Sequence, residues 1–267
     1  FKRNKNDFLL GQKEIKGVVD EYIDLENHNN EKCIDIIQEK KINILFDIMG
    51  LSFPKRISIF NNRVAPTQIS WLATCNTNGI DNIDYLIADK NLISENEENN
   101  YPEKILKLPD IWNAHCGYNL ERNFNISPCE KNNYFTFGSL NSFHKISDQV
   151  IEAWSKILIK CDNSKLILKS STFNCNVENI KNKFQKFGVE NKIEILNKKN
   201  YPYKKDHLGV YKNIDLALDT FPYNGVTTTF EALWMGVPVN VLRGFNFNSR
   251  CGYSIMKNST FEDLISK

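Results

Sequence analysis

The segment 215–239 reads DLALDTFPYNGVTTTFEALWMGVPV and places many hydrogen-bond donors at one turn. An apolar run ends at Asp219, and Asn224 and Gly225 then supply residues that tolerate the backbone angles of a turn. Three threonines follow at the start of an apolar segment, beside the unpaired amides expected at a helix N-terminus. Such amides, together with the positive end of the helix dipole, favour phosphate. The turn therefore predicts a site for the diphosphate of a nucleotide.

The same turn fits a second interpretation. Thr228 and Glu231 have the spacing of a capping box, in which Thr228 caps the helix and Glu231 reaches back to the backbone. Residue types alone leave phosphate binding and helix capping open. The segment has neither the G-x-x-x-x-G-K-[ST] pattern of a P-loop nor the G-x-G-x-x-G pattern of a dinucleotide site.

Short apolar runs alternate with segments of helical character along most of the chain. Residues 1–40 are predicted to be helical and polar. The predicted strands cover 42–50, 67–73, 83–89, 103–109, 134–139, 165–170, 192–196, 214–219 and 237–242. The predicted helices of the later part cover 147–160, 176–188, 206–211 and 228–236. This alternation predicts an α/β fold of parallel βαβ units in doubly wound sheets.

A break in this pattern predicts two domains. Residues 119–133 are rich in Asn, Ser, Pro and Glu and show little periodicity, so we expect a linker there. Residues 1–130 then form an N-terminal half and residues 131–267 a C-terminal domain. In open α/β sheets, ligands collect at the carboxyl ends of the strands, where the turn after Asp219 is expected to lie.

Composition argues against several classes of protein. The 267 residues carry a formal net charge of +2, which is too balanced to indicate a nucleic-acid partner. No apolar run approaches the roughly 18 residues of a membrane helix, so no membrane partner is predicted. Seven scattered cysteines without a C-x-x-C pair are typical of reduced thiols, and we expect a cytoplasmic protein. The four histidines do not cluster with them, so no metal site is predicted.

Several stretches carry a resemblance to a known family. They are DLALDTFPYNGVTTTFEALWMGVPV (215–239), RVAPTQISWL (63–72), IDYLIAD (83–89), FGSLNSFHKISDQVIEAWSKIL (137–158), KKDHLGVYKNIDLALDT (204–220) and SRCGYS (249–254). In this order they resemble the O-linked N-acetylglucosamine transferase family, glycosyltransferase family 41. The resemblance runs from about residue 42 to residue 254.

The resemblance implies a GT-B architecture of two Rossmann-like domains with parallel sheets facing a cleft. It implies inverting transfer of a sugar from a UDP donor to an acceptor protein or peptide, with no cofactor and no obligatory metal. The C-terminal domain would hold the UDP-sugar, and the N-terminal half would face the acceptor. Because the chain opens at Phe1 in an amphipathic pattern, we interpret it as a piece of a longer protein. The family places tetratricopeptide repeats upstream of such a region.

The resemblance also implies roles for individual residues. Lys145 matches the lysine that contacts the donor diphosphate and would neutralise charge on the departing UDP. Thr227 and Thr228 match the paired threonines on that diphosphate. Glu231 stands where the family places an acid against the ribose hydroxyls. The remaining residues expected to bind the UDP-sugar, including those of the turn itself, are Ser142, Lys204, His207, Tyr223, Asn224, Gly225 and Thr229.

Around the base and the sugar, the resemblance is less uniform. His207 matches the histidine that packs near the uridine, and Lys204 matches a lysine near the base. Tyr223 falls beside the uridine and sugar sites. Ser142 stands where relatives often have Gln, and Val226 replaces a residue that is often polar. These differences leave the identity of the sugar open.

The N-terminal half departs further from the family. Relatives have a polar residue where this chain has Leu51, and their glycine-rich loop is replaced by ATCNTNG at 73–79. Transfer of N-acetylglucosamine to Ser or Thr is the first hypothesis, and an N-glucosyltransferase acting on Asn is a close variant. The departures favour the alternative of a degenerate, non-catalytic nucleotide-sugar-binding module. A GT-B enzyme with a small-molecule acceptor is a third possibility.

Overall fold

The structure is a computed structural model, and it describes residues 13–118, 127–169, 177–196, 201 and 203–266. The chain divides into two compact units. The N-terminal unit comprises Phe1–Leu86 with Tyr101–Lys104, and the C-terminal unit comprises Ile87–Asn100 with Ile105–Lys267.

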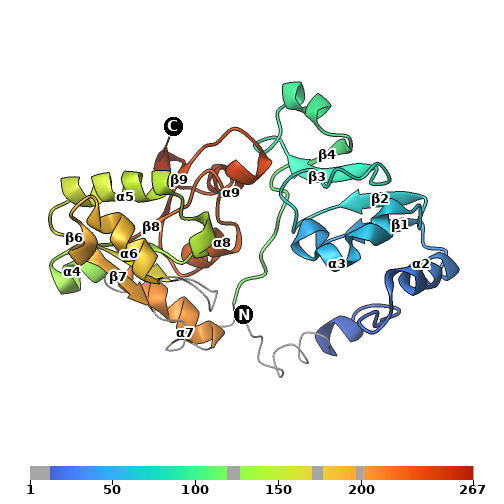
Figure 1. The fold of residues 1–267 in the computed structure, drawn as a ribbon, viewed down its shortest axis with the longest axis horizontal. Coiled ribbons are helices and arrows are strands. Elements are labelled where there is room, and N and C mark those ends of the chain that lie inside the picture. Colours follow the sequence, from blue (N-terminus) through green and yellow to red (C-terminus); the bar gives the residue numbers. More distant parts are fainter. Residues whose placement is uncertain (1–12, 119–126, 170–176, 197–200, 202, 267) are drawn as a thin grey trace. The chain divides into compact units, whose positions relative to one another are not determined.

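A four-stranded sheet contains the first strands of the chain, in the order β1-β2-β3-β4 (Figure 1). The strands are β1 (Ile44–Asp47), β2 (Thr67–Ser70), β3 (Tyr85–Asp89) and β4 (Lys104–Leu108). β1 pairs in parallel with β2, and β2 pairs in parallel with β3. The strand predicted for 67–73 ends early because Leu72 has a left-handed backbone with φ of 81°.

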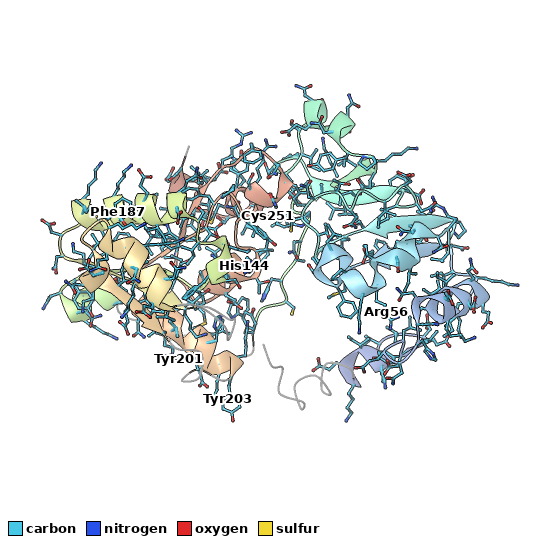
Figure 2. The ribbon with its side chains drawn as sticks, in the orientation of Figure 1. Arg56, His144, Phe187, Tyr201, Tyr203 and Cys251 are labelled. Carbon is cyan, nitrogen blue, oxygen red and sulfur yellow. The ribbon has the colours of Figure 1, made fainter. Side chains whose placement is uncertain are left out.

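Among the described residues 13–40, helices cover less of the chain than predicted. In the described part, α2 (Asn30–Glu39) begins only after Asn29, whose Oδ1 accepts the Lys32 N–H at 2.8 Å. This polar cap stops the helix from extending toward the N-terminus. Arg56 of α3 (Pro54–Ile57) donates to the His28 carbonyl at 2.9 Å and so fixes the segment before α2 (Figure 2).

The second sheet has six strands in the order β10-β9-β8-β5-β6-β7, and every neighbouring pair is parallel. Its strands are β5 (Phe135–Ser139), β6 (Ser164–Lys169), β7 (Ile193–Leu196), β8 (Leu216–Leu218), β9 (Val239–Leu242) and β10 (Ile265–Ser266). This is the strand order of a nucleotide-binding Rossmann fold. The direction of winding reverses between β5 and β8, so ligands are expected beyond the carboxyl ends of these two strands.

Helices cover both faces of this sheet, as Figure 1 shows. Phe137, Leu166 and Leu168 pack on one face against α5 (Asp148–Lys160) and α6 (Val177–Gln185). On the other face, Ile167 and Ala217 share a core with the remaining helices. These are α7 (Lys204–Gly209), α8 (Thr227–Trp234) and α9 (Cys251–Lys257). Alternate strand residues thus enter two cores, and the α/β, doubly wound prediction is confirmed.

The predicted linker at 119–133 is only partly within the described structure, since 119–126 lie outside it. Its last residues belong to the C-terminal unit. Ser127 donates to Asp215 Oδ1 at 2.6 Å, and the Cys129 N–H donates to the same oxygen at 2.9 Å. The short helix α4 (Pro128–Asn132) is therefore fixed to the start of β8.

The compact units divide earlier than the predicted halves 1–130 and 131–267. Arg250 binds both carboxylate oxygens of Glu97, at 2.6 and 2.8 Å. This hydrogen-bonded guanidinium lowers the pKa of Glu97 to about 2. Ser254 of α9 also donates to Asp89 Oδ2 at 2.6 Å. These polar contacts hold the segment from the end of β3 in the C-terminal unit, and their partners are more than 150 residues apart in sequence.

No helix in the described parts of the chain is both long enough and apolar enough to cross a membrane.

Candidate functional site

Asp219 organises the turn that follows β8. Its Oδ1 accepts the Thr220 N–H at 2.8 Å, the Gly225 N–H at 2.7 Å and the Asn141 side-chain amide at 3.2 Å. Asn141 lies just after β5, so one carboxylate oxygen joins the loops of the two strands at the point where the winding reverses. The chain thereby forms a defined surface where the topology places a ligand.

Asn224 and Gly225 shape this turn from inside. The fully buried Asn224 donates to the Thr220 carbonyl at 2.9 Å and accepts the Gly252 N–H at 3.2 Å. A Cβ on Gly225 would lie 2.3 Å from Thr228 Oγ1, so only glycine fits there. Both predicted residues are in the site. The Asn224 side chain and the missing side chain of Gly225 together set the path of the backbone.

The three threonines differ in what their hydroxyls face. Thr227 is exposed, and half-buried Thr228 donates to Asn141 Oδ1 at 2.9 Å. Thr229 is buried and donates to the Gly225 carbonyl at 3.1 Å. Thr227 and Thr228 therefore lie on the accessible side of the turn, whereas Thr229 supports the turn from within.

The capping-box interpretation is wrong. α8 begins at Thr227, its N-cap residue is Val226, and the Val226 side chain makes no cap hydrogen bond. Glu231 does not return to the helix backbone, because its carboxylate is held by Lys204 and His207. The N-terminal amides of α8 thus have no side-chain cap from this pair.

Lys145 reaches the same turn from the β5 side. It ends a 3₁₀ turn (Phe143–Lys145) that comes before Ser147, the N-cap residue of α5. Its Nζ donates to the Asn224 carbonyl at 2.7 Å and lies 3.8 Å from the centre of the Tyr223 ring. The structure therefore places Lys145, Tyr223 and the threonine turn together. Ser142 is the residue before this 3₁₀ turn, and exposed His144 is labelled in Figure 2.

Glu231 is the centre of a buried charged cluster. Only 2% of its surface is exposed. One oxygen forms an ion pair with Lys204, and the other lies 3.0 Å from His207 Nε2. Burial acts to raise the pKa of the Glu231 carboxyl, but the hydrogen bond from His207 and the Lys204 charge hold that pKa below its ordinary value. Glu231 is therefore an ionised acceptor at neutral pH.

His207 lies deeper than a base-packing residue would suggest. It is 2% exposed, and its Nδ1 lies 2.6 Å from the ammonium of Lys169, at the end of β6. Burial lowers the pKa of the His207 imidazole, despite the opposing effect of Glu231. Sequence reasoning did not identify Lys169. The sequence signal that could have found it is a lysine at the end of the apolar strand KLILK. A charged residue at the carboxyl end of a parallel strand lies at the edge of the sheet where ligands bind.

An aromatic group beside Glu231 was also missed. The Tyr118 hydroxyl donates to Glu231 Oε1 at 3.4 Å, and the Lys204 ammonium lies 4.8 Å from the Tyr118 ring centre. His115 stacks on Phe230 of α8, with ring centres 5.5 Å apart. These rings come from a segment about 110 residues before α8, and no local pattern in the sequence indicates the contact.

Asp219 gives the site a pH-dependent component. Deep burial raises the pKa of Asp219 to about 7, although the Gly225 N–H and Lys145 favour the charged form. Its Oδ2 has no hydrogen-bond partner among the described residues. The site therefore holds one carboxyl that titrates near neutrality and one, Glu231, that stays ionised.

We expect the substitution Asp219→Asn to change how stability depends on pH. The unfolded carboxyl releases its proton near pH 3.9, but the folded one does so near pH 7, so the folded state binds more protons between these values. This contribution to stability is complete below pH 4 and is lost as pH rises to 7. Urea unfolding at pH 5 and pH 8 should show the free energy of unfolding of wild type falling relative to Asp219→Asn. A difference between the two proteins that is constant with pH would contradict this assignment.

Among the described residues, no group of three or more His, Cys, Asp or Glu side chains could hold a metal ion.

The fold and site together define a class of protein. A sheet with Rossmann strand order carries, at its reversal point, a turn of backbone amides and hydroxyls, a lysine and an ionised carboxylate. This is the arrangement of a nucleotide-binding α/β domain. The chain matches glycosyl transferase family 41 over residues 4–116 and 129–267, and it belongs to that family.

Known proteins resemble the chain over most of its length. The probable UDP-N-acetylglucosamine–peptide N-acetylglucosaminyltransferase SPINDLY of Hordeum vulgare is 31% identical over 247 residues, which cover 91% of this chain and 26% of that protein. The SPINDLY protein of Eustoma exaltatum subsp. russellianum is 30% identical over 249 residues, covering 91% and 27%. The chain thus spans about a quarter of the length of these relatives.

A solved structure confirms the fold. A mutant of the Thermobaculum terrenum O-GlcNAc transferase superimposes with a TM-score of 0.86 at 28% identity, covering 96% of this chain and 48% of that one. A glycosyltransferase from Rickettsia africae shares the fold at a TM-score of 0.53 and 15% identity, covering 90% of this chain and 69% of that one. The GT-B type predicted from the sequence is confirmed.

Proposed function

We propose that this chain is the donor-binding and catalytic region of an inverting glycosyltransferase. The enzyme moves a sugar, N-acetylglucosamine, from UDP to Ser or Thr of an acceptor protein or peptide. One observation carries the proposal: Lys145 and the threonine turn meet at the reversal point between β5 and β8, and the ionised Glu231 lies on the same helix as the threonines. The names of the relatives support the sugar and the acceptor.

The chemistry follows from the charges of the site. The acceptor hydroxyl attacks the anomeric carbon and releases its proton to the solvent, the bond from that carbon to the β-phosphate oxygen breaks, and the electron pair leaves with UDP. Lys145 lies beside the turn, where its ammonium meets the charge that grows on the departing diphosphate. Thr227 and Thr228, with the first amides of α8, bind the diphosphate oxygens. Because Lys145 and these donors supply the positive potential, we propose a reaction without a cofactor or an obligatory metal ion.

The remaining residues position the nucleoside. Glu231 is an ionised acceptor for the ribose hydroxyls, and Lys204 and His207 orient it by binding its two oxygens. Tyr223 lies beside Lys145 and borders the diphosphate and sugar. The six described cysteines are free, which supports our further proposal that the protein works in the cytoplasm.

A second candidate is a nucleotide-sugar-binding module without transfer activity. Leu51, where the family has a polar residue, is 55% exposed, and its N–H donates to Thr74 of the altered 73–79 loop at 3.0 Å. An N-glucosyltransferase acting on Asn is a variant of the first proposal. UDP release by the full-length protein, measured with and without acceptor peptides containing Ser, Thr or Asn, separates these candidates. Release that no acceptor stimulates would favour the module.

We expect UDP to bind at least about tenfold more tightly than UMP. The added phosphate gains charge-assisted hydrogen bonds from the hydroxyls and amides of the threonine turn, each worth about 1.5–3 kcal/mol. A gain of about 1.4 kcal/mol is enough for a tenfold change in affinity. Calorimetric titration of the full-length protein with each nucleotide measures the difference. Equal affinities would show that the threonine turn is not a diphosphate site.

A further inference from the structure

We propose that Lys169 is a positioning residue of the nucleotide site. It acts through His207 to hold Glu231 as an ionised, correctly oriented acceptor for the two ribose hydroxyls of the donor. The inference rests on the proposed function for the nucleotide, but the hydrogen-bond chain that carries it is independent of any ligand.

Three buried side chains form this chain of hydrogen bonds. Lys169 ends β6, is 1% exposed, and places its Nζ 2.6 Å from His207 Nδ1. The other ring nitrogen, Nε2, lies 3.0 Å from Glu231 Oε2. The members come from β6, α7 and α8, so the contacts join three elements around one carboxylate.

The charges of the end groups determine where the proton of the imidazole resides. An ammonium has donors only, so His207 Nδ1 must accept from Lys169. The proton is then on Nε2, which donates to the Glu231 carboxylate. His207 remains neutral, because burial lowers the pKa of its ring. Removing the ammonium frees Nδ1 to take the proton, and Nε2 would then present a lone pair to the carboxylate.

Fold stability alone does not account for this lysine. Taking an ammonium out of water is costly, so burying Lys169 does not by itself stabilise the fold. The benefit of Lys169 lies in the tautomer that it imposes on His207. Lys204 binds the other oxygen of Glu231, so both carboxylate oxygens have a set direction before a nucleotide binds.

The test compares Lys169→Met with Lys165→Met in the full-length protein. Lys165 is the matched control because it lies on the same strand but is exposed, with its Nζ 4.4 Å from the Tyr134 ring centre. Two readouts are needed: the nitrogen chemical shifts of His207 without ligand, and the Kd of UDP and of 2′,3′-dideoxy-UDP. A thermal melt shows whether each variant is folded, and Lys169→Arg, which keeps a charged donor, is the second variant.

We expect Lys169→Met to shift the His207 proton away from Nε2. We also expect it to lower the affinity for UDP by about tenfold, because one charge-assisted hydrogen bond to the ribose is then misdirected. Dideoxy-UDP should bind Lys169→Met and wild type equally, since it lacks the hydroxyls. Lys165→Met should match wild type in every readout, and Lys169→Arg should retain most of the UDP affinity. An unchanged tautomer, or equal loss for both nucleotides, would overturn the role of Lys169. If wild type binds neither nucleotide, the proposed function fails, and the tautomer measurement still decides the Lys169–His207 link.

Discussion

Lys145→Ala is expected to lower kcat of the full-length protein by about a hundredfold or more, while the Kd of the donor changes by less than about tenfold. The ammonium is held by the Asn224 carbonyl at 2.7 Å and by the Tyr223 ring, so it is in place before reaction begins. Its effect is greatest when the diphosphate takes up the electrons of the broken bond, and a group that acts mainly in the transition state changes kcat more than binding. The loss of one such preorganised hydrogen-bond donor typically lowers kcat by about a hundredfold or more. Single-turnover kinetics and donor titration measure the two effects separately.

Two further variants make this result specific. Lys156→Ala removes an exposed lysine of α5 that pairs with Glu152 on the helix surface, and it should leave kcat unchanged. Lys145→Arg keeps the charge but changes its geometry to a planar fork, so it should restore only part of the rate. All variants must melt at the wild-type temperature. A folded Lys145→Ala protein with normal turnover would remove Lys145 from the reaction.

Glu231→Ala is expected to lower the free energy of unfolding by about 3–5 kcal/mol and to abolish measurable UDP binding. The loss comes mainly from His207 and Tyr211, two buried groups that each lose about 1–3 kcal/mol when their acceptor is removed, whereas Lys204, with 35% of its side chain exposed, can turn to water. Here Lys204 loses its carboxylate, and His207 and Tyr211 lose a hydrogen-bond acceptor. Urea unfolding monitored by circular dichroism gives the stability, and titration of the folded variant with UDP gives the binding.

An exposed pair in the same unit is the control for this variant. Glu262 pairs with Lys257, and about half of the Glu262 side chain is exposed. Glu262→Ala should therefore change the free energy of unfolding by less than about 1 kcal/mol. If both substitutions had the same small effect, the Glu231 cluster would contribute no more than a surface ion pair. If Glu231→Ala were unstable but bound UDP normally, Glu231 would have only a structural role.

The sequence by itself determined the local features of the C-terminal unit. The β-rich apolar runs at 134–139 and 165–170 and the helical segment at 147–160 correspond to β5, β6 and α5 within a few residues. Their period and their bounding turn residues decide these elements with little help from distant contacts. The threonine turn was likewise readable, because glycine, threonine and a following helix are neighbours along the chain.

The tertiary structure alone decided which of these residues work together. Glu231 has the spacing of a capping residue, yet its carboxylate is occupied by Lys204 and His207, 27 and 24 residues away in sequence. Lys169 is 38 residues from His207, and Glu97 is 153 residues from Arg250. Such partners meet only once the strand order is set, and no local period encodes that order. Electrostatic free energy depends on distance and burial in space, so the buried hydrogen-bond chain from Lys169 to Glu231 emerges only from the folded chain.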